Sequence, residues 1–247
     1  MSGQIALWPR WRRHALAAVA AIVLAACAST EPSPAADNRV ARSFAPPSRG
    51  SLVVLLPAPK ADDLQAGQTL MTQQLHRQLV AAGYRVALLD AGNHDVVWGQ
   101  EVAEVGGIYD PGSGALRSAA YAKALSSLAR RLCDELKCAL VIQQRLTVRD
   151  AKLSGSSAAW DGQRRRVPVA GTYGDTLSFS GTGVGLSIEL TAVSADGSPA
   201  FHTFGGASLP YRADASRAQH TLRPDLFADD REIADGVRLA LNPLLQR

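Results

Sequence analysis

The order of apolar and polar residues predicts strands that alternate with helices in the first half of the chain. Residues 52–56 are a continuous apolar run, LVVLL, as in a strand that is covered on both faces. From about residue 62 to Gly83, apolar residues recur every four positions, which predicts a helix of about five turns. Residues 85–89, RVALL, predict a second strand. Together the three segments form a βαβ unit with a right-handed crossover.

Two further helices and a change of period follow. Residues 93–106 predict a short helix, and residues 116–136 predict a long one, because alanine and leucine fall at every fourth position. From residue 140 to 149 the apolar residues alternate, so we expect a strand that buries Leu140, Ile142, Leu146 and Val148 and leaves the other face largely polar.

The second half of the chain predicts an antiparallel meander and a final helix. Residues 184–190 repeat the alternating pattern, and Asp196-Gly197 forms a turn into a strand at 201–204. From about Ala228, acidic residues in the first turn and apolar residues on one side predict a carboxy-terminal helix. The expected fold is α+β: three strands linked by helices, an antiparallel meander and a C-terminal helix, as a two-layer sandwich.

The amino terminus has the pattern of an export signal. Three arginines precede an apolar run at residues 15–26 that is too short to span a bilayer. Small residues lead directly to Cys27, which resembles the lipobox of bacterial lipoproteins. That resemblance implies that residues 1–26 are a signal peptide, that Cys27 carries lipid such as palmitate, and that Ala28 directs the protein to the periplasmic face of the outer membrane. The alternative is an ordinary secretory signal with an incidental cysteine.

Composition divides and classifies the rest. Residues 27–50 are rich in Pro, Ser and Ala and predict a flexible tether, and residues 51–247 predict a single periplasmic domain. Hydrophobic residues make up 47% of the chain, which excludes low-complexity disorder. The net charge of +4 includes the three arginines of the signal segment, so we predict no nucleic-acid partner.

The order of these elements resembles a family. The lipobox, the Pro-rich tether, the unit beginning VVLLP, the strand LVIQQRLTV and the meander with its Asp-Gly turn are similar to the periplasmic domains of the curli-export channel lipoproteins (CsgG-type). Lipoproteins that activate peptidoglycan synthases or assist exopolysaccharide export, and the amino-terminal domain of the Tol-system propeller protein, share the pattern. The resemblance implies an envelope scaffold without catalysis. Residues 150–181 depart from it by their length and Gly/Ser content and contain no membrane-spanning hairpins.

Cys133 and Cys138 are the cysteines that remain after Cys27. Five residues apart in a continuous helix they lie too far apart for a disulfide, so a bridge requires the helix to end between them. An oxidising compartment favours the bridge. The alternatives are two buried free thiols or, because no third ligand accompanies them, less readily a metal site.

The remaining polar residues provide no catalytic motif. His94-Asp95 is the nearest approach to a base with a carboxylate, and its position at a helix start favours a cap. The acidic residues near position 230 lack calcium-loop spacing, and Gly181–Gly185 leads into a strand instead of a helix. We therefore expect neither a metal nor a cofactor. An envelope hydrolase acting on glycan or peptide is the alternative function.

Arginines dominate the candidate interface. The densest cluster, at residues 164–166, follows Trp160 and the turn at Asp161-Gly162. A second set of arginines lies on the polar face of the strand at 140–149. A solvated hairpin arm would also explain them. If these segments pair, they form one exposed basic patch suited to an envelope protein partner or a second copy of the chain, composed of Trp160, Arg164, Arg165, Arg166, Arg145 and Arg149.

Overall fold

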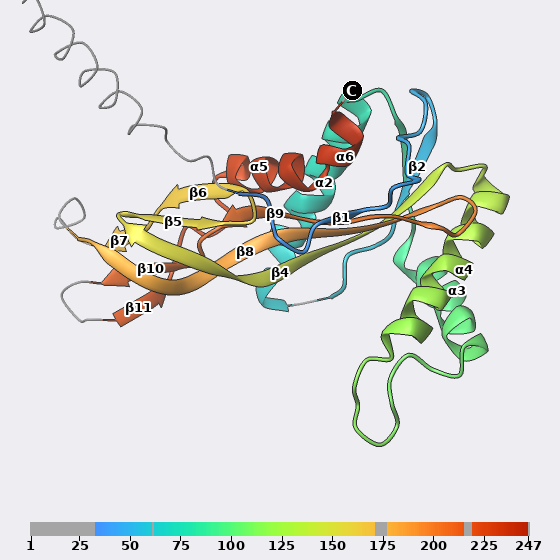
Figure 1. Cartoon of the computed structure of the whole chain (residues 1–247), viewed down its shortest axis with the longest axis horizontal. Helices are drawn as coiled ribbons and strands as arrows, with labels where there is room; N and C mark the ends of the chain where they lie inside the picture. Colours follow the sequence, from blue (N-terminus) through green and yellow to red (C-terminus); the bar gives the residue numbers. More distant parts are fainter. Residues whose placement is uncertain (1–32, 61, 171–176, 215–218, 247) are drawn as a thin grey trace, which may run out of the picture. The chain divides into compact units, whose positions relative to one another are not determined.

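The computed structural model describes residues 33–60, 62–170, 177–214 and 219–246. Its main sheet has the strand order β1-β9-β8-β4-β2-β3 (Figure 1). Strand β2 runs parallel to both β3 and β4, whereas β4, β8, β9 and β1 are mutually antiparallel neighbours. The strands are β1 (Arg39–Val40), β2 (Leu52–Leu55), β3 (Arg85–Leu88), β4 (Leu140–Gly155), β8 (Phe179–Ser194) and β9 (Pro199–Ser208).

A hairpin and a small second sheet complete the strands. The hairpin of β5 (Ser157–Trp160) and β6 (Gln163–Arg166) is attached to the far half of β4. The second sheet has the order β11-β10-β7 and contains β7 (Val169–Ala170), β10 (Tyr211–Asp214) and β11 (Gln219–Leu222).

Helices cover both faces of the main sheet. They are η2 (Asp62–Leu64), α2 (Gln65–Ala81), α3 (Ala91–Glu104), α4 (Ser118–Leu136), α5 (Asp230–Ala240) and α6 (Asn242–Leu245). Figure 1 shows α2, α5 and α6 on one side of the strands and α3 and α4 on the other. In the described part of the chain, no helix combines the length and apolar content needed to cross a membrane.

The core follows from the alternation of side chains in β2. Val53 and Leu55 pack in the cluster with α2, α5 and α6, whereas Val54 and Leu56 pack in the cluster with α3 and α4. This confirms the α+β class and the strand buried on both faces. Because helices occupy both faces, this part of the molecule has three layers, where the sequence predicts two.

The disulfide between Cys133 and Cys138 is present, as the sequence allowed. Helix α4 ends at Leu136, and Lys137 takes a left-handed conformation with φ of 56°. That reversal brings the two Cα atoms to 4.4 Å, within the range of a disulfide. Both cysteines are buried among the side chains of the α4 cluster.

The long strands β4 and β8 differ from the predicted burial. Val148 is 62% exposed, and the β4 side chains that join the core cluster with α2 and α5 end at Leu146. Conversely, Ser187 and Glu189, the polar residues that alternate with the apolar ones in residues 184–190, are buried. Their burial is compensated by hydrogen bonds with the side chains of Asp161, Arg145 and His202. Neither difference could be read from the period of one strand alone.

The prediction of a flexible tether is wrong for residues 33–50. Strand β1 pairs with β9, and Phe44 packs edge-on against Phe201 at a centroid separation of 5.6 Å. The side-chain oxygen of Asn38 also accepts a hydrogen bond from the Phe204 amide. These contacts hold residues 33–50 against the edge of the sheet, so the folded unit begins before Ser51.

Helix α5 approaches strand β9 through paired glycines. A Cβ atom at Gly205 would lie 2.0 Å from the carbonyl oxygen of Gly236, and one at Gly236 would lie 2.9 Å from Ala207. The absence of side chains therefore lets the helix backbone pack directly on the strand.

Candidate functional site

The β5–β6 hairpin is closed by a two-residue turn. Asp161 and Gly162 both have positive φ, 40° and 77°, which is the backbone that Asp-Gly turns of hairpins favour. The Asp161 carboxylate accepts hydrogen bonds from Arg149 at 3.0 Å and from the Ser187 hydroxyl at 2.6 Å. The turn is therefore fixed to strands β4 and β8, and with it the position of the arginines that follow.

Trp160 belongs to the core, and its predicted exposure is wrong. The residue is 5% exposed and packs with Ala151, Ala158 and Leu209. Its indole Nε1 donates to the Leu186 carbonyl at 3.2 Å. The ring fits there because β8 and β9 present glycines to it.

Those glycines leave the space that the indole occupies. A Cβ atom at Gly185 would lie 2.7 Å from Trp160 Nε1, and one at Gly206 would lie 3.0 Å from the same atom. Trp160 thus covers two glycine positions of the main sheet and fastens the hairpin to it.

Alternation along β6 divides the three arginines between its two faces. Trp160 pairs with Gln163 and Ala158 with Arg165, so Arg165 shares the inner face of the hairpin. Arg165 donates from Nε to the Ala207 carbonyl at 2.6 Å and from Nη2 to the Asp235 carboxylate at 3.3 Å. Arg164 and Arg166 lie on the opposite face and are exposed, as predicted for them.

A second arginine comes from beyond strand β11. Arg223 is 9% exposed; it donates to both carboxylate oxygens of Asp225, at 2.9 and 3.2 Å, and to Glu232 at 3.2 Å. The hydrogen bonds from Arg223 hold the pKa of Asp225 below its usual value. Glu232 also accepts a hydrogen bond from the Ser208 hydroxyl, so this network ties the start of α5 to β9.

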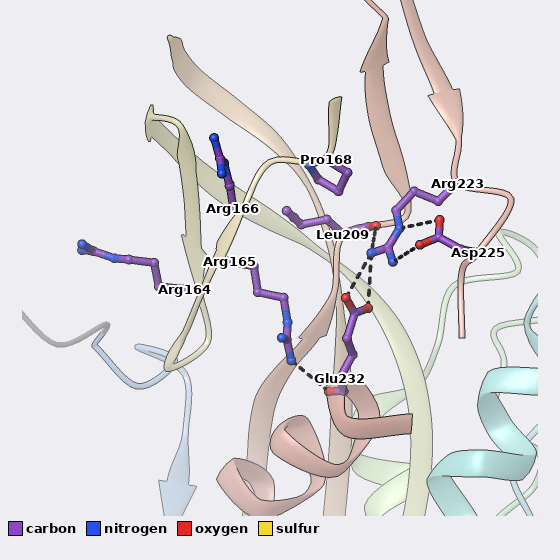
Figure 2. Close-up of a pocket in the computed structure, with 8 residues that line it drawn as sticks. All are labelled: Arg164, Arg165, Arg166, Pro168, Leu209, Arg223, Asp225 and Glu232. Carbon is purple, nitrogen blue, oxygen red and sulfur yellow. Dashed lines mark hydrogen bonds and ion pairs between the residues drawn. The ribbon is translucent and has the colours of Figure 1, made fainter. Parts of the chain in front are cut away.

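These groups line a polar cleft of about 390 Å³ (Figure 2). Figure 2 shows Arg165 pointing toward Glu232, whereas Arg164 points away from it. Four guanidinium groups and two carboxylates line the cleft, which leaves an excess of positive charge. A fixed guanidinium fork suits a carboxylate or phosphate, so the cleft and its outer rim can bind an anionic group. Its lining consists of Arg164, Arg165, Arg166, Pro168, Leu209, Arg223, Asp225 and Glu232.

Arg145 does not join this cleft, although the sequence places it in one patch with the hairpin. It lies on β4, donating to Glu189 at 2.7 Å, and His202 contacts the other oxygen of Glu189 at 3.0 Å. Burial alone would raise the pKa of Glu189, but the hydrogen bonds from His202 and Arg145 outweigh it and keep that pKa below the usual value.

Arg149 is also a structural residue. Its guanidinium lies 4.1 Å from the ring centroid of Phe204 and contacts both Asp37 and Asp161. The two carboxylates lie on the segment before β1 and on the hairpin turn. Arg149 thus joins three separate segments, and the single basic patch predicted from sequence resolves into this junction, the Glu189 cluster and the cleft.

The sequence also singles out Cys27 and His94. Cys27 falls outside the described residues. His94 contacts Asp95 at 3.2 Å and stacks on Trp98. The prediction that this pair caps a helix is wrong, because both residues lie within α3 and the capping side chain is that of Asp90. Among the described residues, no three His, Cys, Asp or Glu side chains gather as a metal site.

Arg223 and its contact with Glu232 could not be predicted from the sequence. From the sequence, Glu232 is expected in the first turn of a helix, where the helix dipole favours an acidic residue, and it does lie in the first turn of α5. Its partner, nine residues earlier, is brought to it by the return of the chain from β11, and no spacing rule indicates that contact.

Comparison with known proteins places the chain in no family. No protein-family model matches it, and no curated protein matches it. Among solved structures, the dodecamer of a PelC point variant from Paraburkholderia phytofirmans superposes with a TM-score of 0.39 at 10% identity, covering 85% of this chain and 99% of that one. A second PelC dodecamer from the same organism gives 0.37 at 11% identity, with the same coverage. PAM12A gives 0.24 at 14% identity and covers 81% of this chain and 44% of that one.

Proposed function

We propose that this chain is a non-catalytic accessory protein of a bacterial cell envelope, anchored by lipid at Cys27 in the periplasmic face of the outer membrane, that holds an anionic surface of a protein partner. The observation that carries the interface is the two-sided hairpin. Its inner face is fixed by Trp160 and Arg165, and its outer face presents Arg164 and Arg166.

A fixed hairpin is a suitable platform for recognition. The inner residues restrict the motion of strand β6, so the outer arginines need lose less conformational freedom on binding. Arginine is enriched at protein interfaces because its planar fork binds carboxylates with two parallel hydrogen bonds. The adjacent cleft, with Arg223 held in place by Asp225, extends the same positive surface.

The anchor is supported by the sequence of residues 1–27, which joins positive charge, an apolar run and small residues before a cysteine. Several acyl chains on one residue give stable membrane attachment. Labelling cells with a palmitate analogue should mark the protein, and Cys27→Ala should abolish the label. A variant that remains labelled contradicts lipidation at this residue.

The interface is tested by reversing its charge in intact cells. We expect Arg164→Glu/Arg166→Glu to keep the circular dichroism spectrum of the folded chain and to lose its chemically crosslinked partner. A matched control is Arg39→Glu/Lys123→Glu, which makes the same change of charge at exposed positions of β1 and α4. If both variants lose the partner, or both keep it, the hairpin is not the interface. Hydrolysis of envelope glycan or peptide by the purified protein contradicts the non-catalytic role.

A further inference from the structure

A groove of about 1,070 Å³ lies between helix α2 and the carboxyl ends of strands β2 and β3. This is the edge of a parallel sheet at which α/β proteins commonly bind ligands. Leu55 and Leu56 form buried parts of its wall, whereas Val80 and Leu88 are 48% and 55% exposed. The groove thus offers a largely aliphatic surface to a ligand and shares no residue with the arginine cleft.

One polar side chain of the groove makes no hydrogen bond to the described part of the chain. Gln68 lines the groove, and in the described part of the chain its side-chain amide makes no hydrogen bond. The residue is only 3% exposed, but its amide atoms are not fully enclosed, because the fully buried unpaired side-chain atom of the described residues belongs to Glu101. The neighbouring Gln144 donates to the Leu56 carbonyl at 2.9 Å and accepts from the Thr72 hydroxyl at 3.1 Å. The Gln68 amide therefore opens into the groove, where it can both donate a hydrogen bond to a ligand and accept one from it.

The same side of the molecule has an open strand edge. Strand β3 is the last strand of the main sheet and pairs only with β2 among the described strands. The Arg85 and Leu89 amides donate toward β2, so the backbone groups of the intervening residues Val86 and Leu88 face outward. Such an edge can accept a further strand from another chain.

The rim of the groove is mainly basic. Lys60, His76 and Arg77 line it. The guanidinium of Arg77 forms a long ion pair with Asp230, at 3.9 Å, in which both side chains are more than half exposed. The lining carboxylate, Asp90, accepts a hydrogen bond from the Asn93 amide at the start of α3. A ligand with a carboxylate therefore complements this rim.

We propose that this groove binds an extended peptide segment of a partner protein, with aliphatic side chains at alternate positions and an acidic residue against the basic rim. Its backbone would pair with the edge of β3 and meet the amide of Gln68, while its aliphatic side chains cover Leu88 and Val80. A hydrocarbon chain would leave those polar groups unpaired. No Phe, Tyr or Trp side chain lines the groove among the described residues, which disfavours a sugar. The proposal does not rest on the envelope role.

The probe is a random dodecapeptide library displayed on phage, selected against the purified full chain. We expect enrichment of peptides that alternate aliphatic residues and carry an acid, with binding lost in Leu88→Lys. Failure to enrich such peptides, or equal binding to Leu88→Lys, overturns the proposal. A fluorescent fatty acid that displaces every selected peptide assigns the groove to lipid and also overturns it. A chain that self-associates and becomes monomeric in Leu88→Lys assigns the groove to a second copy instead.

A matched pair of variants on α2 separates binding from stability. Gln68→Leu removes the unpartnered amide, so we expect selected peptides to bind about tenfold more weakly while the unfolding midpoint stays the same or rises. Gln74 is as deeply buried, at 4% exposed, but donates to Asp230 at 3.2 Å. Gln74→Leu should lower the midpoint and leave peptide affinity unchanged. If Gln68→Leu instead lowers the midpoint and leaves peptide affinity unchanged, Gln68 stabilises the fold and does not bind the peptide. Arg164→Glu/Arg166→Glu should bind the peptides as the unchanged chain does. A failure of the peptide proposal can therefore be distinguished from a failure of the proposed hairpin interface.

Discussion

Replacing Trp160 by alanine should cost the domain a large part of its stability. The residue is 5% exposed, fills the space above Gly185 and Gly206 and donates one hydrogen bond to the Leu186 carbonyl. Truncating a buried tryptophan costs about 3–5 kcal/mol, against a total of about 5–15 kcal/mol for a typical domain. We therefore expect the free energy of unfolding to fall by about 4 kcal/mol.

Urea unfolding followed by circular dichroism measures this loss, with Trp160→Phe as the control. Phenylalanine keeps most of the packing and loses the indole hydrogen bond, so it should cost about 1–2 kcal/mol. If Trp160→Ala unfolds within about 1 kcal/mol of the unchanged chain, the indole does not fasten the hairpin, and the rigid presentation of the outer arginines loses its basis.

Three further changes test the packing, the bridge and the buried charge. Gly205→Ala should destabilise the domain by about 3 kcal/mol in urea because its Cβ would meet the backbone of α5, whereas Gly99→Ala, which meets nothing within 4 Å, should gain about 0.5–1 kcal/mol. The free energy of unfolding of Cys133→Ala/Cys138→Ala should be about 2 kcal/mol lower than that of the unchanged chain, because the bridge that closes a short loop is lost. If the unchanged chain is equally stable with and without reductant, this expectation is wrong. Glu189→Gln should be less stable than the unchanged chain at pH 7. Because the folded pKa of Glu189 lies below the usual 4.5, this difference should shrink as the pH falls below about 4.5, and a pH-independent difference between two denaturation series would refute the linkage.

Features with a local cause could be predicted from the sequence. The apolar run at 52–56 marks a strand whose alternate side chains enter both core clusters. The four-residue repeat of α4 and the switch of period after it are equally local, because each follows from the geometry of one element. The bridge between Cys133 and Cys138 could be allowed on the same ground, since it needs only that the helix end at Leu136.

Features that depend on register could not be predicted. Trp160 and Arg165 share a face that turns inward, but which face of a hairpin is buried depends on how it docks on β8 and β9. The glycines that receive the indole lie 25 and 46 residues further along the chain, so the sequence alone does not associate them with Trp160. For the same reason Arg149, predicted as an interface residue, proves to join three segments of the fold.

We propose that the outer face of the β5–β6 hairpin contacts a protein partner in the cell envelope. The most direct test is a photo-crosslinking amino acid introduced in living cells at position 166, with position 123 on α4 as the exposed control. We predict a single crosslinked envelope protein from position 166 and none from position 123. No adduct from position 166, or the same adducts from both positions, would contradict the claim.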